Sequence, residues 1–138
     1  MRNNKNPMQD LRRPLGIYVH VPFCRSKCEY CDFYSLGGGM NRESMDLYLQ
    51  AVLAHIRESA QRVVGYEVDT VYFGGGTPSF FGHQGLIRIL TEIDRRFRLS
   101  KDAEITLEAN PDSVNAQSLE KLRRAGFNRI SIGVQTDD

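Results

Sequence analysis

Residues 68–76 read VDTVYFGGG, a β-branched and aromatic run that ends on three glycines. A short apolar run closed by glycine predicts a buried strand, because it matches the length and composition of strands rather than helices. Three further runs have the same character: 17–23 (IYVHVPF), 104–109 (EITLEA) and 129–134 (RISIGV). Four strands are therefore expected.

The intervals between these runs carry apolar residues at helical spacing. They predict helices from Asn41 to about Val63, from Leu86 to Phe97, and from near Asn115 to Gly126, with Asn115 at the start and Gly126 just past the end of the last. Strict alternation of strand and helix predicts an α/β fold of parallel strands joined by right-handed crossovers.

Unusual segments follow each expected strand. Cysteines follow the first, glycines the second, Glu108 to Pro111 the third, and Gln135 the fourth. Because parallel strands end at the same edge of the sheet, these segments should meet there, where α/β proteins bind their ligands. A ligand site is expected at this edge.

Composition narrows the class of protein. The 138 residues carry a formal net charge of +1, a pI near 7.7 and 41% hydrophobic residues, typical of an ordinary globular domain. So small a charge does not favour nucleic acid as a partner. No apolar run reaches the roughly 18 residues of a membrane span, and the first residues lack the apolar segment of a secretory signal. We therefore expect a cytoplasmic location.

The three cysteines form one motif, Cys24, Cys28 and Cys31, with the spacing C-x3-C-x2-C. Three thiolates this close can hold one inorganic centre, and a 4Fe-4S cluster held by three cysteines leaves one iron open to another ligand. A zinc site would need a fourth ligand, for which His20 or Asp32 is available. Buried cysteines without a ligand role are the third alternative. Concentration of all three cysteines in eight residues favours the cluster.

The segments around the cysteines and after the later strands resemble those of a known protein family. IYVHVPFCRSKCEYCDF, VYFGGGTPS, LEANP and SIGVQ occur in the order found in radical S-adenosylmethionine proteins, and resemble the oxygen-independent coproporphyrinogen III oxidase family with its heme chaperone relatives. The resemblance covers residues 15–136. It implies the N-terminal part, about four strands and three helices, of a partial parallel (β/α)6 barrel. We expect a flexible tail over 1–13 and an incomplete core domain over 14–138, with the rest of the barrel and a C-terminal domain absent.

The resemblance also implies residue roles. Cys24, Cys28 and Cys31 would ligate the cluster, and S-adenosylmethionine would bind the open iron. The implied cofactor contacts are Tyr18, Tyr30, Gly75, Gly76, Thr77, Glu108 and Gln135. From the residues alone, the glycines could instead form a plain turn or a phosphate nest, Glu108 could be a solvated strand-end carboxylate, and Tyr18 could belong to the core. His20 should share a face with Tyr18, and a structural role is favoured for it.

Two functions follow from the resemblance. One is a heme chaperone that transfers heme to an acceptor protein; the other is an enzyme that decarboxylates coproporphyrinogen III. The oxidases carry a further cysteine two positions beyond the third, where this chain has Phe33, so the chaperone is favoured. The implied partners are heme or porphyrin, an electron donor protein and a heme-accepting protein, and the heme site is expected outside these residues. No catalytic residue is assigned. A zinc-binding interaction module is the remaining alternative.

Overall fold

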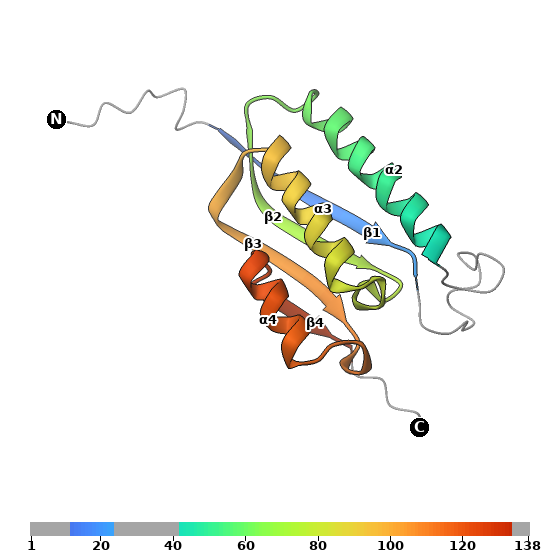
Figure 1. Cartoon of the computed structure of the whole chain (residues 1–138). Coiled ribbons are helices and arrows are strands. Elements are labelled where there is room, and N and C mark those ends of the chain that lie inside the picture. The colour runs from blue at the N-terminus through green and yellow to red at the C-terminus, as the bar shows by residue number, and fades with distance from the viewer. Residues whose placement is uncertain (1–11, 24–41, 134–138) are drawn as a thin grey trace.

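The computed structural model describes residues 12–23 and 42–133. These residues form four strands and three α-helices, with two short 3-10 turns (Figure 1): β1 (Arg13–Val21), α2 (Arg42–Ala60), β2 (Tyr66–Gly75), η2 (Pro78–Phe81), α3 (His83–Arg96), β3 (Leu99–Ala109), η3 (Pro111–Ser113), α4 (Ala116–Ala125) and β4 (Arg129–Ile132). All neighbouring strands are parallel and the sheet order is β1-β2-β3-β4. The predicted α/β class, the alternation of strands and helices along the chain and the parallel pairing are confirmed.

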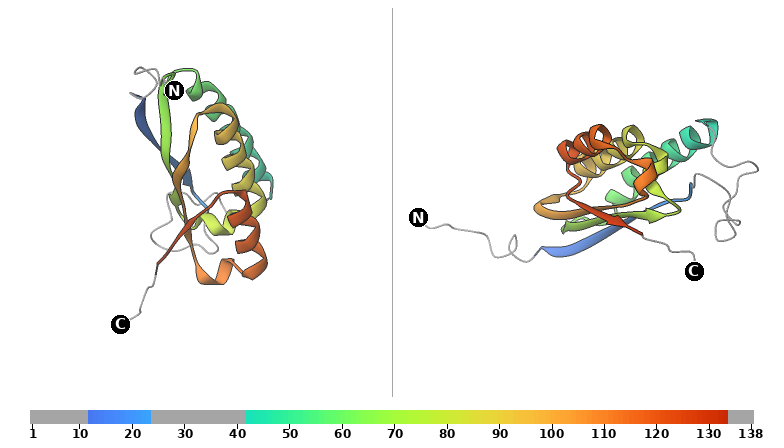
Figure 2. Two further views of the ribbon diagram at one scale, coloured as in Figure 1. Left: turned by 90° about the vertical axis from the view of Figure 1, so that its left-hand side faces the viewer. Right: turned by 90° about the horizontal axis from the view of Figure 1, so that it is seen from below.

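The three helices cover one face of the sheet, as the edge-on views show (Figure 2). Alternate strand residues such as Val21, Phe73 and Leu107 point into this layer and are fully buried against Leu90 and Ile93 of α3 and their neighbours. This alternation is the two-residue period of a strand. The opposite side of the sheet, called the open face below, is not covered by any helix of the described residues.

All four strands differ in length from the prediction; β4 ends at Ile132, whereas the prediction extended to residue 134. β1 begins at Arg13 rather than at Ile17, so the last residue of the expected tail lies in the sheet; it also ends at Val21, two residues early. β2 runs through Gly74 and Gly75, which pair with His20 and Val21. Pairing uses only backbone groups, so glycines can extend a strand that their propensity predicts to end.

β3 begins at Leu99, five residues earlier than the sequence predicted. Leu99 pairs with Val68, and a register irregularity follows before Thr70 pairs with Glu104. The added segment is polar and carries no strand signal of its own, so only its neighbour β2 makes it a strand.

The predicted ends of α4 are confirmed. Asn115 Oδ1 accepts the Ser118 N–H at 2.8 Å, and Ser118 Oγ accepts the Asn115 N–H at 3.0 Å, which completes a capping box. Gly126 ends the helix with a φ of 125°, a conformation that favours glycine.

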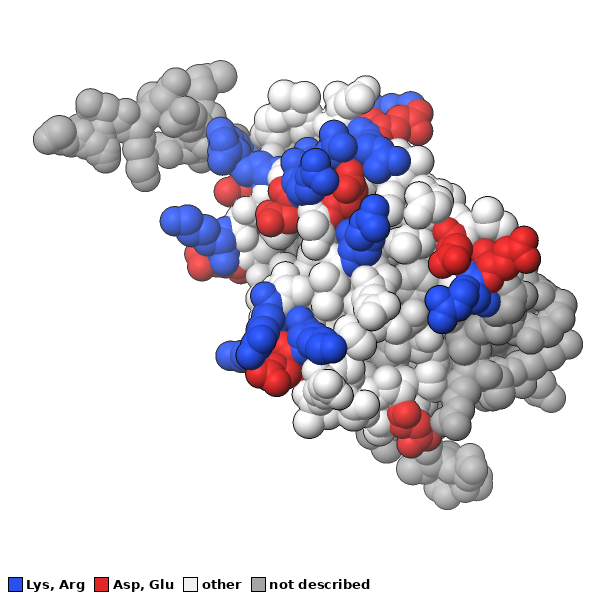
Figure 3. All heavy atoms as spheres, in the orientation of Figure 1, with Lys and Arg blue, Asp and Glu red and all other residues white. Residues whose placement is uncertain are grey.

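A buried carboxylate joins α2 to α3. Glu92 Oε2 lies 2.8 Å from Arg96 Nε and 3.5 Å from Arg57 Nη1, and the Glu92 side chain is 7% exposed. The hydrogen bond from Arg96 is the largest cause that lowers the pKa of Glu92, and the charges of the nearby arginines add to it. Elsewhere on the helix side, acidic and basic side chains are interspersed (Figure 3).

The edge of the sheet formed by β4 carries two exposed apolar side chains. Ile130 and Ile132 of β4 pair with core residues of β3 yet remain 37% and 49% exposed. An exposed apolar edge strand of this kind tends to pair with another chain. Within 12–23 and 42–133, none of the helices is long and apolar enough to cross a membrane.

Candidate functional site

Side chains of all four strands meet on the open face near its C-terminal edge. The strand register aligns Tyr18 with Tyr72, Tyr72 with Thr106, and Thr106 with Arg129. One step nearer the edge, His20 pairs with Gly74 and Glu108 with Ser131. Two adjacent rows of polar and aromatic groups therefore cross the sheet near the edge where all four strands end, which is where the sequence predicted a ligand site.

Glu108 is hydrogen-bonded through both carboxylate oxygens. The Tyr72 hydroxyl donates to Oε2 at 2.7 Å, and the backbone N–H of Gly75 donates to Oε1 at 3.2 Å. Both donors come from β2, whereas Glu108 belongs to β3. Glu108 is thus an oriented carboxylate on the open face rather than a solvated strand end.

In the glycine segment after Phe73, the position of Gly75 requires glycine. Gly75 has a φ of 119°, and a Cβ placed there would lie 2.8 Å from the Val21 carbonyl oxygen and 3.0 Å from the His20 ring. An L side chain would therefore be strained and would also collide with β1. The absence of a side chain keeps β1 and β2 close at this edge.

The backbone donors of this segment are engaged within the protein. Gly75 N–H binds Glu108, Gly76 N–H donates to the Val21 carbonyl at 2.9 Å, and Thr77 N–H donates to the Phe23 carbonyl at 2.8 Å. A phosphate nest requires such N–H groups to point at the anion. The phosphate-nest interpretation is therefore wrong for this segment. A ligand at this edge meets acceptors instead, the Glu108 carboxylate and backbone carbonyls, which suit ammonium and hydroxyl groups.

Phe23, which directly precedes Cys24, is anchored in an aromatic cluster. Its ring stacks on Phe81 with centroids 5.8 Å apart, and Tyr48 of α2 packs edge-on against Phe23 and Phe81 at 5.4 Å and 5.3 Å. The Tyr48 hydroxyl also donates to the His20 carbonyl oxygen. Burial raises the pKa of Tyr48, with a smaller contribution from Tyr18, so the hydroxyl stays protonated. Packing thus fixes the position of Phe23, the last described residue before the cysteine motif.

A buried serine joins the segments that follow β2 and β3. Ser79 Oγ accepts the Asn110 N–H at 3.1 Å and is hydrogen-bonded to Ser113 Oγ. Ser79 is 5% exposed. It holds the GGGTPS and EANP segments together on the helix side of the edge, while Glu108 joins them on the open face.

Comparison with known proteins decides the family. The model of the Radical SAM superfamily matches residues 18–138. The chain belongs to the radical SAM superfamily. It is 42% identical over 125 residues to heme chaperone HemW of Escherichia coli, covering 89% of this chain and 32% of that protein. It is 36% identical over 123 residues to oxygen-independent coproporphyrinogen III oxidase of Salmonella typhimurium, covering 89% of this chain and 27% of that protein.

A solved radical SAM structure supports the fold. Coproporphyrinogen III oxidase (HemN) from Escherichia coli, described as a radical SAM enzyme, superimposes with a TM-score of 0.77 at 34% identity, over 92% of this chain and 30% of that one. The described strands and helices therefore match part of the radical SAM fold. The chain spans about a third of the length of the proteins it resembles.

Membership of the radical SAM superfamily implies a 4Fe-4S cluster and S-adenosylmethionine, and the residues present fit both. The cysteine motif supplies soft thiolates. S-adenosylmethionine is cationic at its sulfonium and amine and carries ribose hydroxyls, and the edge of the sheet offers an oriented carboxylate and carbonyl acceptors to such groups.

The predicted radical SAM site residues divide into two sets. Glu108, Gly75, Gly76 and Thr77 are brought together at one edge, and Tyr18 lies beside them, 58% exposed on the open face with its hydroxyl 3.1 Å from His20 Nδ1. The interpretation of Tyr18 as a core residue is therefore wrong, whereas the expectation that Tyr18 and His20 share a face is confirmed. The other set lies outside the described residues: Cys24, Cys28, Cys31, Tyr30 and Gln135. No cluster of histidine, cysteine and acidic residues able to hold a metal occurs within 12–23 and 42–133.

Sequence reasoning missed Tyr72, Tyr48 and Ser79. Tyr72 stands two residues before Gly74, a spacing that places it on the same face, but its contact with Glu108, two residues beyond its partner Thr106, depends on the register between β2 and β3. Ser79 lies inside the quoted GGGTPS motif without an assigned role. Tyr48 carried no signal beyond its position on an amphipathic helix.

Proposed function

We propose that this chain is the cofactor-binding part of a heme chaperone of the radical SAM superfamily. In this proposal Cys24, Cys28 and Cys31 hold a 4Fe-4S cluster, and S-adenosylmethionine binds beside it at the edge formed by β1, β2 and β3. The whole protein would bind heme and pass it to an acceptor protein in the cytoplasm, with an electron donor serving the cluster.

One observation supports the cofactor site above all. Glu108 and the Gly75–Thr77 segment meet at the C-terminal edge of the sheet, and Thr77 is hydrogen-bonded to Phe23, the residue before Cys24. Binding groups for the nucleoside are thereby adjacent in space to the start of the cysteine motif. When bound, the cluster and S-adenosylmethionine supply one-electron radical chemistry, and the protein supplies position and exclusion of water.

Different residues of the chain would contact different parts of S-adenosylmethionine. Glu108 would accept hydrogen bonds from the ribose hydroxyls or the methionyl amine, and Gly75, Gly76 and Thr77 would contact the methionyl end. Tyr18, Tyr30 and Gln135 would complete the contacts. Because the N–H groups of residues 75–77 are already bonded, we assign their contacts to carbonyl oxygens and to the Thr77 hydroxyl.

Two observations favour the chaperone. The identity to HemW of Escherichia coli is 42%, against 36% to the oxidase of Salmonella typhimurium. Phe33 occupies the position of the further cysteine that the oxidases carry.

The second candidate is an oxygen-independent coproporphyrinogen III oxidase. The likeness to HemN, with a TM-score of 0.77, favours it. It would remove one hydrogen atom from each of two propionate side chains with a radical derived from S-adenosylmethionine; each side chain would then lose carbon dioxide and pass one electron to an acceptor, leaving a vinyl group.

The cofactor proposal is tested by anaerobic reconstitution with iron and sulfide. We expect a brown protein whose absorption and electron paramagnetic resonance spectra change on addition of S-adenosylmethionine. Replacing Cys24, Cys28 or Cys31 with serine should abolish iron and sulfide binding, whereas Ser26→Ala, in the same motif, should not. A colourless protein with stoichiometric zinc would contradict the proposal.

The two functions are separated by a second experiment on the whole protein, reconstituted in the same way, because the heme site is expected outside these residues. The chaperone predicts heme binding and transfer of heme to an apo-acceptor, without consumption of coproporphyrinogen III. Conversion of coproporphyrinogen III to protoporphyrinogen IX with a reductant under strict anaerobiosis would instead establish the oxidase.

A further inference from the structure

Tyr72 is the side chain through which β2 reaches the Glu108 carboxylate. Its hydroxyl donates to Oε2 at 2.7 Å across the open face. We propose that Tyr72 is a positioning residue, whose hydroxyl fixes the orientation in which the Glu108 carboxylate meets S-adenosylmethionine. This inference rests on the proposed cofactor role of Glu108.

The two donors to Glu108 leave it able to bind a ligand. Tyr72 occupies one acceptor site on Oε2, and the Gly75 N–H occupies one on Oε1. An ionised carboxylate has about four such sites, so about one on each oxygen remains. A carboxylate held at both oxygens cannot rotate away, so less conformational entropy is lost when the ligand binds.

The donor from Tyr72 is uncharged, and this suits a cationic ligand. Pairing with arginine would neutralise the carboxylate, but the nearby Arg129 is directed to other groups, with Nη1 3.5 Å from Thr106 Oγ1 and Nε 3.9 Å from Glu104 Oε2. Arg129 therefore does not compete with a cationic ligand for the Glu108 carboxylate.

The Tyr72 ring is itself held in place. It stacks beside Tyr18 with centroids 6.1 Å apart and an interplanar angle of 19°. A Cβ on Gly74 would lie 3.0 Å from Tyr72 Cε1 and 3.0 Å from Glu108 Oε1, so the missing side chain lets tyrosine and carboxylate meet. The contact between Tyr72 and Glu108 therefore depends on Tyr18, which stacks on the Tyr72 ring, and on the absence of a side chain at Gly74.

The same contact raises the pKa of the Tyr72 hydroxyl. The hydrogen bond to Glu108 is the largest cause that raises the pKa of Tyr72, while Ser131 and Arg129 lower it to a smaller extent. The hydroxyl therefore stays protonated, and remains a donor, at neutral pH.

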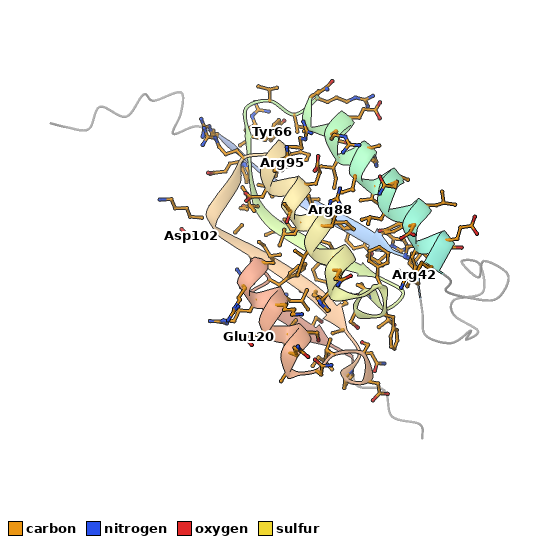
Figure 4. All side chains as sticks on the ribbon, viewed as in Figure 1. Arg42, Tyr66, Arg88, Arg95, Asp102 and Glu120 are labelled. Atoms are coloured by element: carbon orange, nitrogen blue, oxygen red, sulfur yellow. The ribbon has the colours of Figure 1, made fainter. Side chains whose placement is uncertain are left out.

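The test measures the affinity of the full, anaerobically reconstituted chain for S-adenosylmethionine by equilibrium dialysis. The variants are Tyr72→Phe, Glu108→Gln and the double substitution. Tyr66→Phe is the matched control, because Tyr66 lies at the far end of the same strand (Figure 4). Tyr72→Phe keeps the ring that stacks on Tyr18 and removes only the hydroxyl.

We expect Tyr72→Phe to weaken binding about tenfold, which corresponds to about 1.4 kcal/mol. In the Glu108→Gln background it should have no further effect, because a residue that acts through Glu108 has nothing left to position. Tyr66→Phe should bind as the unsubstituted chain does, and the melting temperatures of the two tyrosine variants should agree.

Each other outcome has a defined meaning. Unchanged binding by Tyr72→Phe, with weakened binding by Glu108→Gln, overturns this inference and leaves the proposed function intact. Additive effects in the double variant also overturn it, since Tyr72 would then act independently of Glu108. Unchanged binding by Glu108→Gln removes the cofactor role of Glu108 itself.

A second measurement needs no cofactor. Spectrophotometric titration of the tyrosines should show two groups with a raised pKa, Tyr48 and Tyr72. One of them should disappear in Tyr72→Phe and shift downward in Glu108→Gln, while the other should stay in both variants. A titration curve that Glu108→Gln leaves unchanged would overturn the contact in solution, and with it the inference.

Discussion

The backbone N–H of Thr77 donates a hydrogen bond of 2.8 Å to the carbonyl oxygen of Phe23. This bond lies beyond the paired ends of β1 and β2, and it joins the glycine segment to the residue that precedes Cys24. Together with the bond from Gly76 to Val21, it ties the residues that lead up to Cys24 to the backbone of residues 75–77. Substitutions at residues 75–77, which are distant from the cysteines in the sequence, should therefore affect cluster uptake.

Gly75→Ala should lower both stability and cluster uptake. Alanine at a φ of 119° is strained by about 1–3 kcal/mol, and its Cβ would also press on the Val21 carbonyl oxygen. Gly82→Ala is the matched control, because Gly82 has a φ of 102° with no atom within 4 Å of an added Cβ. Urea unfolding and iron content after reconstitution check this. Equal iron content in the two variants would contradict it.

Gly85→Ala should destabilise the chain although alanine is the better helix former. An added Cβ would overlap the Phe81 ring, which is packed against Phe23 and Tyr48 and so cannot move freely. Overpacking of this kind costs about 1–3 kcal/mol, more than the gain in helix propensity of about 1 kcal/mol. Gln84→Ala, at the exposed neighbouring position, should have little effect. A more stable Gly85→Ala variant would show that the aromatic cluster adapts.

Ser79→Ala should cost about 1–3 kcal/mol of unfolding free energy, because it leaves the Asn110 N–H without its buried acceptor. Ser100→Ala provides the comparison, since Ser100 Oγ accepts the Asp102 N–H at 3.2 Å in an exposed setting at the other end of β3. Chemical denaturation measures both. Equal losses would indicate that the Ser79 bond contributes nothing beyond an ordinary surface contact.

Stability should fall in acid through Glu92. Its folded-state pKa is lowered from the usual 4.5, so the unfolded chain takes up the proton first. The stabilising contribution is fully present above about pH 4.5 and is lost as the pH falls through the folded-state value.

Glu92→Gln should therefore lower the melting temperature by several degrees at neutral pH and flatten its decline in acid. Glu120→Gln is the control, because the pair that Glu120 forms with Arg124 is exposed to solvent. Melting curves from pH 3 to pH 7 test this. Parallel acid declines in the two variants would contradict a role for Glu92.

Local signals predicted the capping of α4 and the class of the fold. Asn115 and Gly126 bound this helix as expected, since capping and a positive φ depend only on nearby residues. The early part of β3 could not be predicted, because residues 99–103 carry no strand signal of their own and Leu99 pairs with Val68 of β2, a partner distant in the sequence.

The sequence by itself determined the alternation of strands and helices, the shared edge of the unusual segments and the family, because these follow from periodicity and from contiguous motifs. Only the tertiary structure decided which groups meet at that edge. Tyr72 and Glu108 are 36 residues apart, and their contact depends on the register of two parallel strands. The neighbours of β2 on both sides also engage the backbone N–H groups of residues 75–77, Glu108 on one side and Val21 and Phe23 on the other, so the edge offers acceptors to a ligand. Hydrogen-bond partners are set by the pairing of distant strands, which no local pattern of residue types specifies.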